Sequence, residues 1–366
     1  MMSSIIFSLF ISSLTCFLII RYGRLHSNLI SDPVKGGPQK FHAYPVPRIG
    51  GVAIMGGMLA GGITAWLIGQ EACSKKYLLI LICSIPAFAG GIFEDFTKKV
   101  SVKERLLLSM LAAGLGFFLL DARLTRFSLP LVDNWLEFLP FSLLLTLVAV
   151  SGIANAVNII DGFNGLAAMV SSFIAVALAY ISYQVGDASL FFVCLSLIGA
   201  IIGFFVWNYP NGFIFLGDGG AYLIGFMIAE VSVLLVNRHP EVSPWFPMLL
   251  VIYPVWETLF SIYRKKFLRG QSPGKPDGLH FHMMVYKRLL RSEVGHREAR
   301  RFTRRNAITS PYLWGMSLVG VIPAVLFWRN TLLLICFVMI FILLYVWLYW
   351  KIVRFKSPMW LVMKNR

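Results

Sequence analysis

Charged residues are scarce in this sequence, and acidic ones are scarcer than basic ones. Only 14% of the 366 residues are Asp, Glu, Lys or Arg, and 17 acidic residues stand against 33 basic ones. Soluble domains carry roughly a quarter of their residues as charged side chains. Because 58% of the residues are hydrophobic, too few polar residues remain to build a water-facing surface. The composition therefore excludes an ordinary soluble domain.

Several other features are missing. The chain has five cysteines, and all but Cys73 fall inside long apolar runs, so we expect no disulfide framework. The sequence contains no Walker-type glycine loop, which argues against ATP hydrolysis. It also lacks a fixed-period repeat and a low-complexity tract. We therefore expect one membrane domain over residues 1–366.

Long apolar runs are what the sequence does contain. A helix needs about 20 apolar residues to cross a hydrocarbon layer of ~30 Å, and a chain inside the bilayer must satisfy its own backbone hydrogen bonds. We therefore predict an all-α polytopic membrane protein with about eleven transmembrane helices. The predicted spans are 4–20, 50–69, 77–94, 105–120, 138–156, 166–185, 189–206, 219–236, 245–263, 312–328 and 331–350.

The basic residues predict how these spans are oriented. If the N-terminus lies outside, all but six of the 33 Lys and Arg residues fall in cytoplasmic segments, thirteen of them in the polar loop at 264–311. Cytoplasmic loops carry such an excess, so we expect a periplasmic N-terminus and a cytoplasmic C-terminus. The net charge of +16 then reflects topology and attraction to anionic lipids. We expect no nucleic-acid partner.

Polar residues gather at the predicted cytoplasmic ends of the spans. The segment NAVNIIDGFNGLA, at 155–167, separates two apolar runs. A carboxylate and amides next to hydrocarbon are costly unless they face a polar site, so they indicate function. The candidate residues are Asn155, Asn158, Asp161 and Asn164 in this segment, Glu94 and Asp95 after the third span, Asp218 before the eighth, His280 and His282 in the long loop, and His42 and Arg48 before the second span.

Each of these groups also has a simpler interpretation. Asp218 could be a helix cap, the Glu94–Asp95 pair could be an ordinary interfacial pair, and the two histidines could be solvated. Together, however, they supply carboxylates for Mg²⁺, which prefers one or two of them plus substrate phosphates, and cations for phosphate oxygens. This inventory suits phosphoryl transfer from a nucleotide diphosphate. Glu230 and Glu257 lie inside predicted spans, and the sequence assigns them no role beyond packing or polar contacts.

Five motifs in order resemble one family, the polyprenyl-phosphate N-acetylhexosamine-1-phosphate transferases. They are PRIGG, an acidic pair followed by SVKERL, NAVNIIDGFNGLA, FLGDGGAYLIGF and HFH, between about Lys40 and Lys287. The resemblance implies transfer of a sugar 1-phosphate from a UDP-N-acetylhexosamine to undecaprenyl phosphate, with release of UMP. It also implies a requirement for Mg²⁺, with Mn²⁺ as an alternative. The enzyme would start a cell-envelope glycan, such as O-antigen or capsule, in the bacterial inner membrane, with its site facing the cytoplasm.

The resemblance also implies roles for individual residues. It gives catalytic roles to Asp95, Glu94 and Asp161, metal binding to Asp218, and substrate binding to His42, Arg48, Asn155, Asn158, Asn164, His280 and His282. Asp95 would either deprotonate the lipid phosphate or orient it. The chain departs from the family pattern at Glu94 and Asn164, where Asp is usual, and at Met283, where another His is frequent.

Three alternatives stay open from the sequence. Within the enzyme class, the runner-up is the related transferase that forms lipid I from phospho-MurNAc-pentapeptide. A membrane transporter would place its polar residues near the bilayer midplane, and a structural scaffold would leave the converging carboxylates unexplained. The sequence does not identify the sugar or the glycan pathway, and it is compatible with an oligomer.

Overall fold

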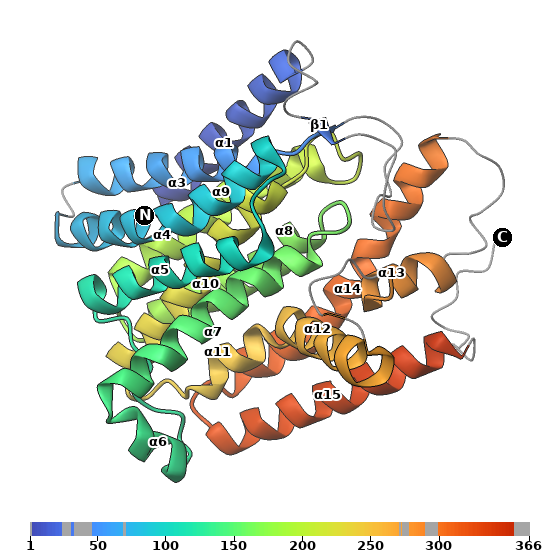
Figure 1. Ribbon diagram of the computed structural model, residues 1–366. Helices are drawn as coiled ribbons and strands as arrows, with labels where there is room; N and C mark the ends of the chain where they lie inside the picture. Colours follow the sequence, from blue (N-terminus) through green and yellow to red (C-terminus); the bar gives the residue numbers. More distant parts are fainter. Residues whose placement is uncertain are drawn as a thin grey trace.

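The computed structural model describes residues 2–23, 31–32, 46–68, 71–270, 272, 278–289 and 299–354, and most of them are helical (Figure 1). The helices are α1 (Met2–Gly23), α3 (Gly50–Leu67), α4 (Glu71–Thr97), α5 (Val102–Leu120), α6 (Pro130–Leu136), α7 (Leu139–Ile160), α8 (Leu166–Gln184), α9 (Ala188–Asn208), α10 (Gly217–Arg238), α11 (Trp245–Leu250), α12 (Ile252–Tyr263), α13 (Phe281–Met284), α14 (Ala299–Leu326) and α15 (Thr331–Val353). Two π-helical turns, η2 (Arg264–Leu268) and η3 (Val285–Leu289), continue α12 and α13. The strands β1 (Ser31–Asp32) and β2 (Val46–Pro47) pair antiparallel.

The bundle is apolar on its outside as well as in its core. Within the described ranges, nine helices are long and apolar enough to cross a membrane: α1, α3, α4, α7, α8, α9, α10, α14 and α15. Large apolar side chains on several of them point outward, such as Leu144 at 59% exposure and Leu332 at 71%. Water would penalise so much exposed apolar surface, whereas lipid does not. The chain is an all-α polytopic membrane protein, as predicted.

Two predicted spans differ from the other nine. The 105–120 span is the helix α5, which is 19 residues long but carries Lys103, Glu104 and Arg105 in its first turn. The prediction of one continuous helix over 245–263 is wrong, because α11 ends and α12 begins around Val251. Pro254 has no N–H to donate to the carbonyl of Leu250 and its ring crowds that carbonyl, which interrupts the helix there.

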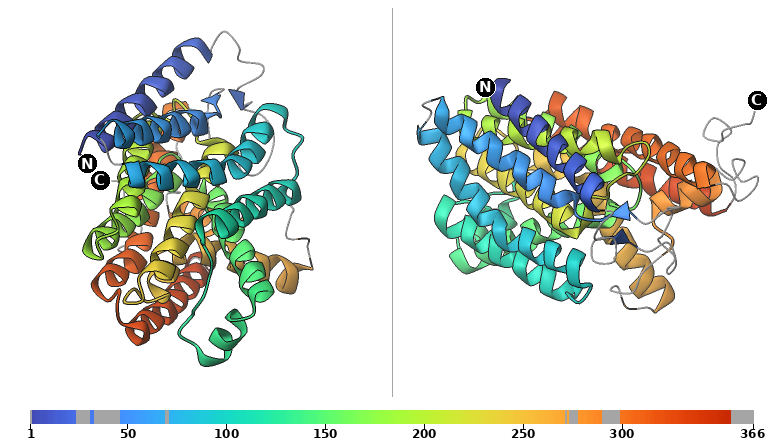
Figure 2. Two further views of the ribbon diagram at one scale, coloured as in Figure 1. Left: turned by 90° about the vertical axis from the view of Figure 1, so that its left-hand side faces the viewer. Right: turned by 90° about the horizontal axis from the view of Figure 1, so that it is seen from above.

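Helix α10 is the centre of the bundle. It packs against α3, α4, α5, α7, α8 and α9, and Figures 1 and 2 show it enclosed by these neighbours. Glycines allow the close contacts. A Cβ on Gly91 of α4 would come within 2.5 Å of the Asp218 backbone, and one on Gly51 of α3 would come within 2.3 Å of the Gly220 nitrogen. Helices α3 and α4 therefore approach the start of α10 almost backbone to backbone.

The segment before α3 pairs with the segment before α10. The N–H of Phe215 donates to the Pro47 carbonyl at 2.8 Å, and the N–H groups of Gly50 and Gly51 donate to the carbonyls of Phe215 and Leu216, both at 2.9 Å. These bonds join the PRIGG and FLGDGG motifs, which are about 170 residues apart in the sequence. As a result, Arg48 lies beside the N-terminus of α10.

The close packing of α7 on α10 leads to a test at Gly225. A Cβ there would lie 2.5 Å from the Ala154 Cα, so Gly225→Ala should force the two helices apart and destabilise the protein by about 1–3 kcal/mol. Gly152→Ala is the matched control, because a Cβ at Gly152 meets nothing within 4 Å. Thermal unfolding in detergent measures both. Equal unfolding temperatures for the two variants would contradict the close approach of α7 and α10.

Candidate active site

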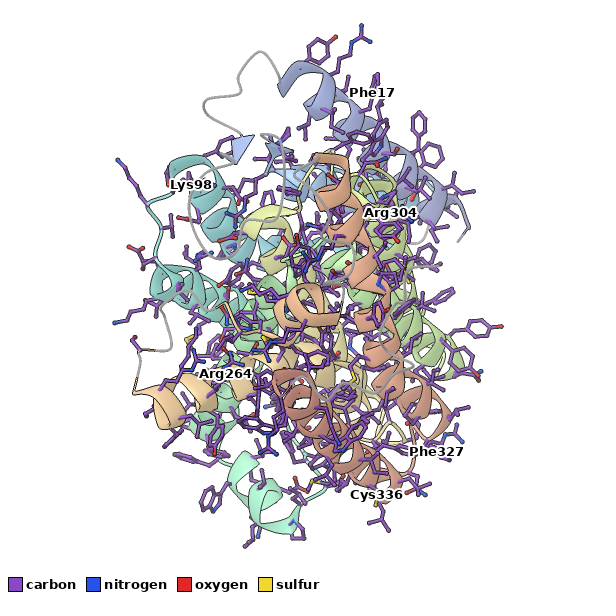
Figure 3. All side chains as sticks on the ribbon, turned by 90° about the vertical axis from the view of Figure 1, so that its right-hand side faces the viewer. Phe17, Lys98, Arg264, Arg304, Phe327 and Cys336 are labelled. Carbon is purple, nitrogen blue, oxygen red and sulfur yellow. The ribbon has the colours of Figure 1, made fainter. Side chains whose placement is uncertain are left out.

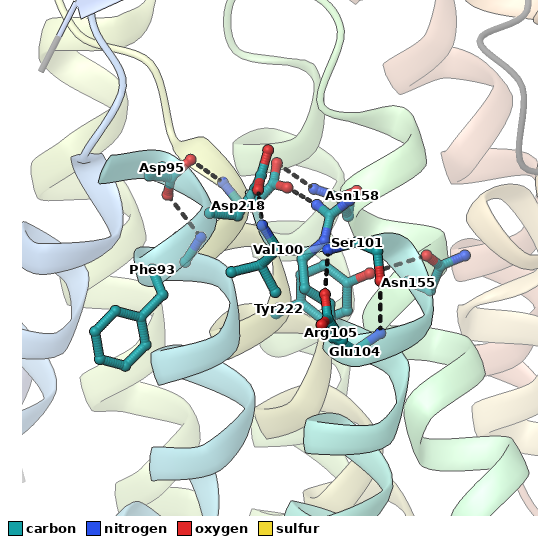
Figure 4. Close-up of polar contacts among 12 residues, drawn as sticks. Phe93, Asp95, Val100, Ser101, Glu104, Arg105, Asn155, Asn158, Asp218 and Tyr222 are labelled. Carbon is teal, nitrogen blue, oxygen red and sulfur yellow. Dashed lines mark hydrogen bonds and ion pairs between the residues drawn. The ribbon is translucent and has the colours of Figure 1, made fainter. Parts of the chain in front are cut away.

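The Asp95 carboxylate holds the N-terminus of α10. The first N–H groups of a helix have no partner within the helix, and here two of them donate to Asp95. The Asp218 N–H reaches Oδ1 and the Gly219 N–H reaches Oδ2, both at 2.9 Å (Figure 4). A negative charge is favourable at this end of a helix dipole. Asp95 is itself 1% exposed and ties the end of α4 to the start of α10.

The Asp218 side chain lies in a shell of donors. Arg48 and Arg105 both form ion pairs with its carboxylate, and the Asn158 amide donates to Oδ1 at 3.0 Å. The Arg48 Nε is also 3.6 Å from Asp95 Oδ1. Asp218 is 3% exposed, and a buried carboxylate is costly unless it is paired. Three separate parts of the chain supply this pairing, and two of the partners, Arg48 and Asn158, are among the predicted residues.

Arg105 and Tyr222 are site residues that the sequence analysis missed. The Arg105 guanidinium lies 5.7 Å from the centre of the Tyr222 ring, and the Tyr222 hydroxyl donates to Asn155 Oδ1 at 3.0 Å. Asn155 therefore reaches Asp218 indirectly, through Tyr222 and Arg105. The position of Arg105 in SVKERL, shortly after the acidic pair, is a sequence signal for this role. As a basic residue in a predicted cytoplasmic segment, however, Arg105 indicates only membrane topology.

Glu94 and Asn164 are predicted site residues whose side chains contact other parts of the chain. The Glu94 carboxylate accepts the Val100 N–H at 2.8 Å and so supports the turn between α4 and α5. The Asn164 side chain donates to the Pro210 carbonyl at 2.9 Å, and its backbone N–H donates to Asn306 Oδ1. In this structure both residues make structural contacts and neither touches Asp218.

The two histidines pack against the turn between α7 and α8, which begins at Asp161. The side chain of His282 packs edge-on against Phe163, with ring centres 5.6 Å apart, and its Nε2 would lie 3.3 Å from a Cβ on Gly162. The His280 ring stacks on His282 at 5.2 Å. Burial raises the pKa of Asp161 to about 7, although the positive charge of Arg48 opposes this shift. The histidine segment therefore lies next to Asp161. His42 lies outside the described residues.

Glu257 anchors the histidine turn. One of its carboxylate oxygens, Oε1, accepts the Phe281 N–H at 2.9 Å and lies 3.0 Å from His280 Nδ1, while Oε2 accepts the Tyr345 hydroxyl at 2.9 Å. The sequence alone assigns Glu257 no role beyond packing or polar contacts. A glutamate inside an apolar run signals a buried polar contact, but its partners come from a distant loop and from α15, which sequence spacing does not reveal.

Comparisons with known proteins identify the family. The family model described as glycosyl transferase family 4 matches residues 77–236. A Lactobacillus johnsonii phospho-N-acetylmuramoyl-pentapeptide-transferase is 31% identical over 255 residues, which cover 65% of this chain and 76% of that protein. This chain belongs to glycosyl transferase family 4.

Other relatives carry names with a different sugar. A Bacillus subtilis protein named "Probable undecaprenyl-phosphate N-acetylglucosaminyl 1-phosphate transferase" is 26% identical, over 81% of this chain and 80% of its own. A decaprenyl-phosphate N-acetylglucosaminephosphotransferase of Mycolicibacterium smegmatis is 27% identical, over 77% and 71%. The family resemblance that the five sequence motifs indicate is therefore confirmed.

The Asp218 carboxylate could supply one oxygen ligand to a magnesium ion that is shared with a substrate. Among the residues that the structure describes, no three His, Cys, Asp or Glu side chains are grouped closely enough to hold a metal alone. Mg²⁺ does not need such a group, because it commonly binds one or two carboxylates plus substrate phosphates. In this structure the Asp218 carboxylate pairs with Arg48 and Arg105, so a bound Mg²⁺ would take the place of these arginines at the carboxylate.

The raised pKa of Asp161 predicts a pH-dependent stability. In the unfolded chain an aspartate loses its proton near pH 4, whereas folded Asp161 keeps it up to about pH 7. The contribution of this group to the free energy of unfolding therefore falls as the pH rises from about 4 to 7. Asp161→Asn should lose less thermal stability than the unmodified protein between pH 5 and pH 8.

Intrinsic tryptophan fluorescence in detergent measures the unfolding temperatures. Asp121→Asn is the matched control, because Asp121 is an exposed aspartate at the far end of α5, with a side chain 65% exposed. If Asp161→Asn and Asp121→Asn show the same loss between the two pH values, burial does not set the protonation of Asp161.

Proposed function

We propose that this protein transfers an N-acetylhexosamine 1-phosphate from a UDP-sugar to undecaprenyl phosphate and releases UMP, to start a cell-envelope glycan. The observation that carries the proposal is the pairing of buried Asp218 with Arg48 and Arg105 at the N-terminus of α10. The names of the N-acetylglucosamine 1-phosphate transferases among the relatives support the same reaction.

The location of the site suits two substrates of different solubility. Asp95, Asn158 and Asp218 lie at helix ends, so a nucleotide can approach from water. The surrounding helices present apolar side chains to lipid, where a polyprenyl chain can lie. A helix N-terminus and two guanidinium groups are favourable surroundings for phosphate oxygens. The same residues therefore fit both the donor diphosphate and the acceptor phosphate.

In the proposed reaction, an oxygen of the lipid phosphate attacks the β-phosphorus of the UDP-sugar. A new phosphorus–oxygen bond forms there, and the bond from the β-phosphorus to the bridging oxygen breaks, so UMP leaves with that oxygen. Asp218 would hold Mg²⁺, or Mn²⁺ in its place, which neutralises phosphate charge. Arg48 and Arg105 would then bind phosphate oxygens, and Asn158, Asp161, His280 and His282 would orient the nucleotide.

Asp95 fits a positioning role better than a role as a base. Both of its oxygens already accept backbone N–H groups of α10. A phosphate monoester has a second pKa near 6, so it is largely ionised at neutral pH and needs no base to become a nucleophile. In this proposal Asp95 sets the position of Asp218, and the attacking oxygen requires no proton transfer to the protein.

We infer a topology in which the site faces the cytoplasm of a bacterial inner membrane. Counted with α5 and the α11–α12 pair, the nine long helices make about eleven passes. Asp95 ends α4, Asn158 is near the end of α7, and Asp218 is near the start of α10, so alternating passes bring them to one face. The excess of basic residues on that face favours the cytoplasm, with the N-terminus outside.

Two alternatives have different expected outcomes. The lipid I reaction is supported by the 31% identical phospho-N-acetylmuramoyl-pentapeptide-transferase, and it differs only in the donor sugar. A transporter is less favoured, because the Asp218 shell lies at helix ends, whereas transport sites typically lie near the midplane. A transporter would accumulate a solute in proteoliposomes and would not release UMP.

The decisive test is to incubate purified protein with undecaprenyl phosphate, MgCl₂ and a panel of UDP-sugars. We expect one UDP-N-acetylhexosamine to give UMP and a lipid-linked sugar of the corresponding mass in mass spectrometry. Asp218→Asn should lower turnover by about 10²-fold or more. A lipid product from UDP-MurNAc-pentapeptide alone would favour the alternative enzyme, and no lipid product from any donor would refute the proposal.

A second variant tests the role of Arg105. Arg105→Gln removes an ion pair with Asp218 and should lower turnover by about 10²-fold, as loss of a charge-stabilising donor does in other enzymes. Lys103→Gln is the matched control, because Lys103 is an exposed cation in the same helical turn. Equal turnover of the two variants would remove Arg105 from the site.

A further inference from the structure

A second pocket lies away from the Asp218 shell. It has a volume of about 230 Å³ and lies between the end of α12 with η2, α13 with η3, and the C-terminal turn of α15. Three of its lining residues are arginines, Arg264, Arg269 and Arg288, and none of the described residues that line it is acidic. None of the residues that surround Asp218 takes part. Three arginines that line one small pocket make it favourable for an anion.

Two of the arginines are held in place by the surrounding structure. Arg264 is 4% exposed, and its Nη1 donates to the Leu279 carbonyl at 2.8 Å and to the Tyr349 hydroxyl at 2.9 Å. Arg288 donates to the Ile352 carbonyl at 3.1 Å, at the end of α15. Figure 3 labels Arg264 beside this part of the molecule. The pocket is therefore bordered by guanidinium groups whose positions do not depend on a ligand.

The surface around the pocket has the composition of a membrane–water interface. Leu268 and Trp350, which line it, are 51% and 39% exposed. On the neighbouring surface, the exposed rings of Phe267 and Trp347 lie beside Lys266 and Lys351, at 5.7 Å in each case. Aromatic rings and basic side chains concentrate at the membrane–water interface. The pocket therefore offers cations to a phosphate and apolar surface to the chains attached to it.

We propose that this pocket binds the phosphate headgroup of an anionic phospholipid from the adjoining leaflet. Basic pockets between membrane helices on the cytoplasmic side recognise such headgroups. The phosphate lies between the arginines, and an acyl chain runs along Leu268 and Trp350. A free phosphate would use the arginines but leave the exposed apolar rim without a partner. The proposal does not depend on the transferase reaction, because the two sites share no residue.

Native mass spectrometry of the detergent-purified full chain tests this binding. We expect bound phosphatidylglycerol, and much weaker retention of phosphatidylcholine, whose headgroup has no net charge. Arg269→Gln should weaken phosphatidylglycerol binding by about tenfold, the value of one charge-assisted hydrogen bond. Arg269 is exposed at the end of η2, so this change should leave the unfolding temperature unaltered. Arg329→Gln removes an equal charge beside Trp328, outside the pocket, and should leave binding unchanged.

Three results would overturn the proposal. The first is equal phosphatidylglycerol binding by Arg269→Gln and Arg329→Gln. The second is displacement of phosphatidylglycerol by millimolar inorganic phosphate, which would identify a free-anion site. The third is displacement by equimolar undecaprenyl phosphate, which would assign the pocket to the acceptor substrate. Because binding is read directly, a protein that binds phosphatidylglycerol but lacks turnover would support this proposal and count against the proposed function.

Discussion

The arrangement of the site depends on the Asp95 carboxylate, which accepts two backbone N–H groups at the start of α10. A buried helix start needs such acceptors, because its first N–H groups have no partners within the helix. With Asp95 in place, α4 and α10 cannot shift relative to each other without leaving these donors unpaired. Gly91 allows this contact and Gly51 allows α3 to approach the same part of α10, since a side chain at either position would collide with the α10 backbone.

Asp218, whose N–H donates to Asp95, carries the carboxylate at the centre of the candidate site. Its carboxylate is buried, so it requires compensating charge, which Arg48 and Arg105 supply in this structure. The pairing also orients two arginines that would otherwise be long, flexible side chains at a membrane surface. The Arg105 guanidinium lies over the Tyr222 ring, and the Tyr222 hydroxyl donates to Asn155. The polar network therefore extends from Asp218 to Asn155. A diphosphate that entered would compete with Asp218 for both guanidinium groups, and a divalent cation could replace them at the carboxylate.

Much of this arrangement could be predicted from the sequence, because long apolar runs and polar helix ends are local features. Nine of the predicted spans correspond to long helices, and Arg48, Asp95, Asn158 and Asp218 do meet. Glu94 and Asn164 were harder to place, because side chains a few residues apart in one motif face different neighbours. Glu94 supports a turn, whereas Asn164 bonds to the 210 region and α14. Motif membership alone does not distinguish these directions.

By itself, the sequence determined that the chain is a helical membrane protein with carboxylates, amides and cations at the ends of its spans. Hydrophobicity and backbone hydrogen bonding decide this locally, since each apolar run must become a helix in lipid. Only the tertiary structure decided that Arg105 pairs with Asp218 and that Glu257 holds the histidine turn. Those outcomes depend on which helix faces which, and therefore on close packing between residues far apart in the chain.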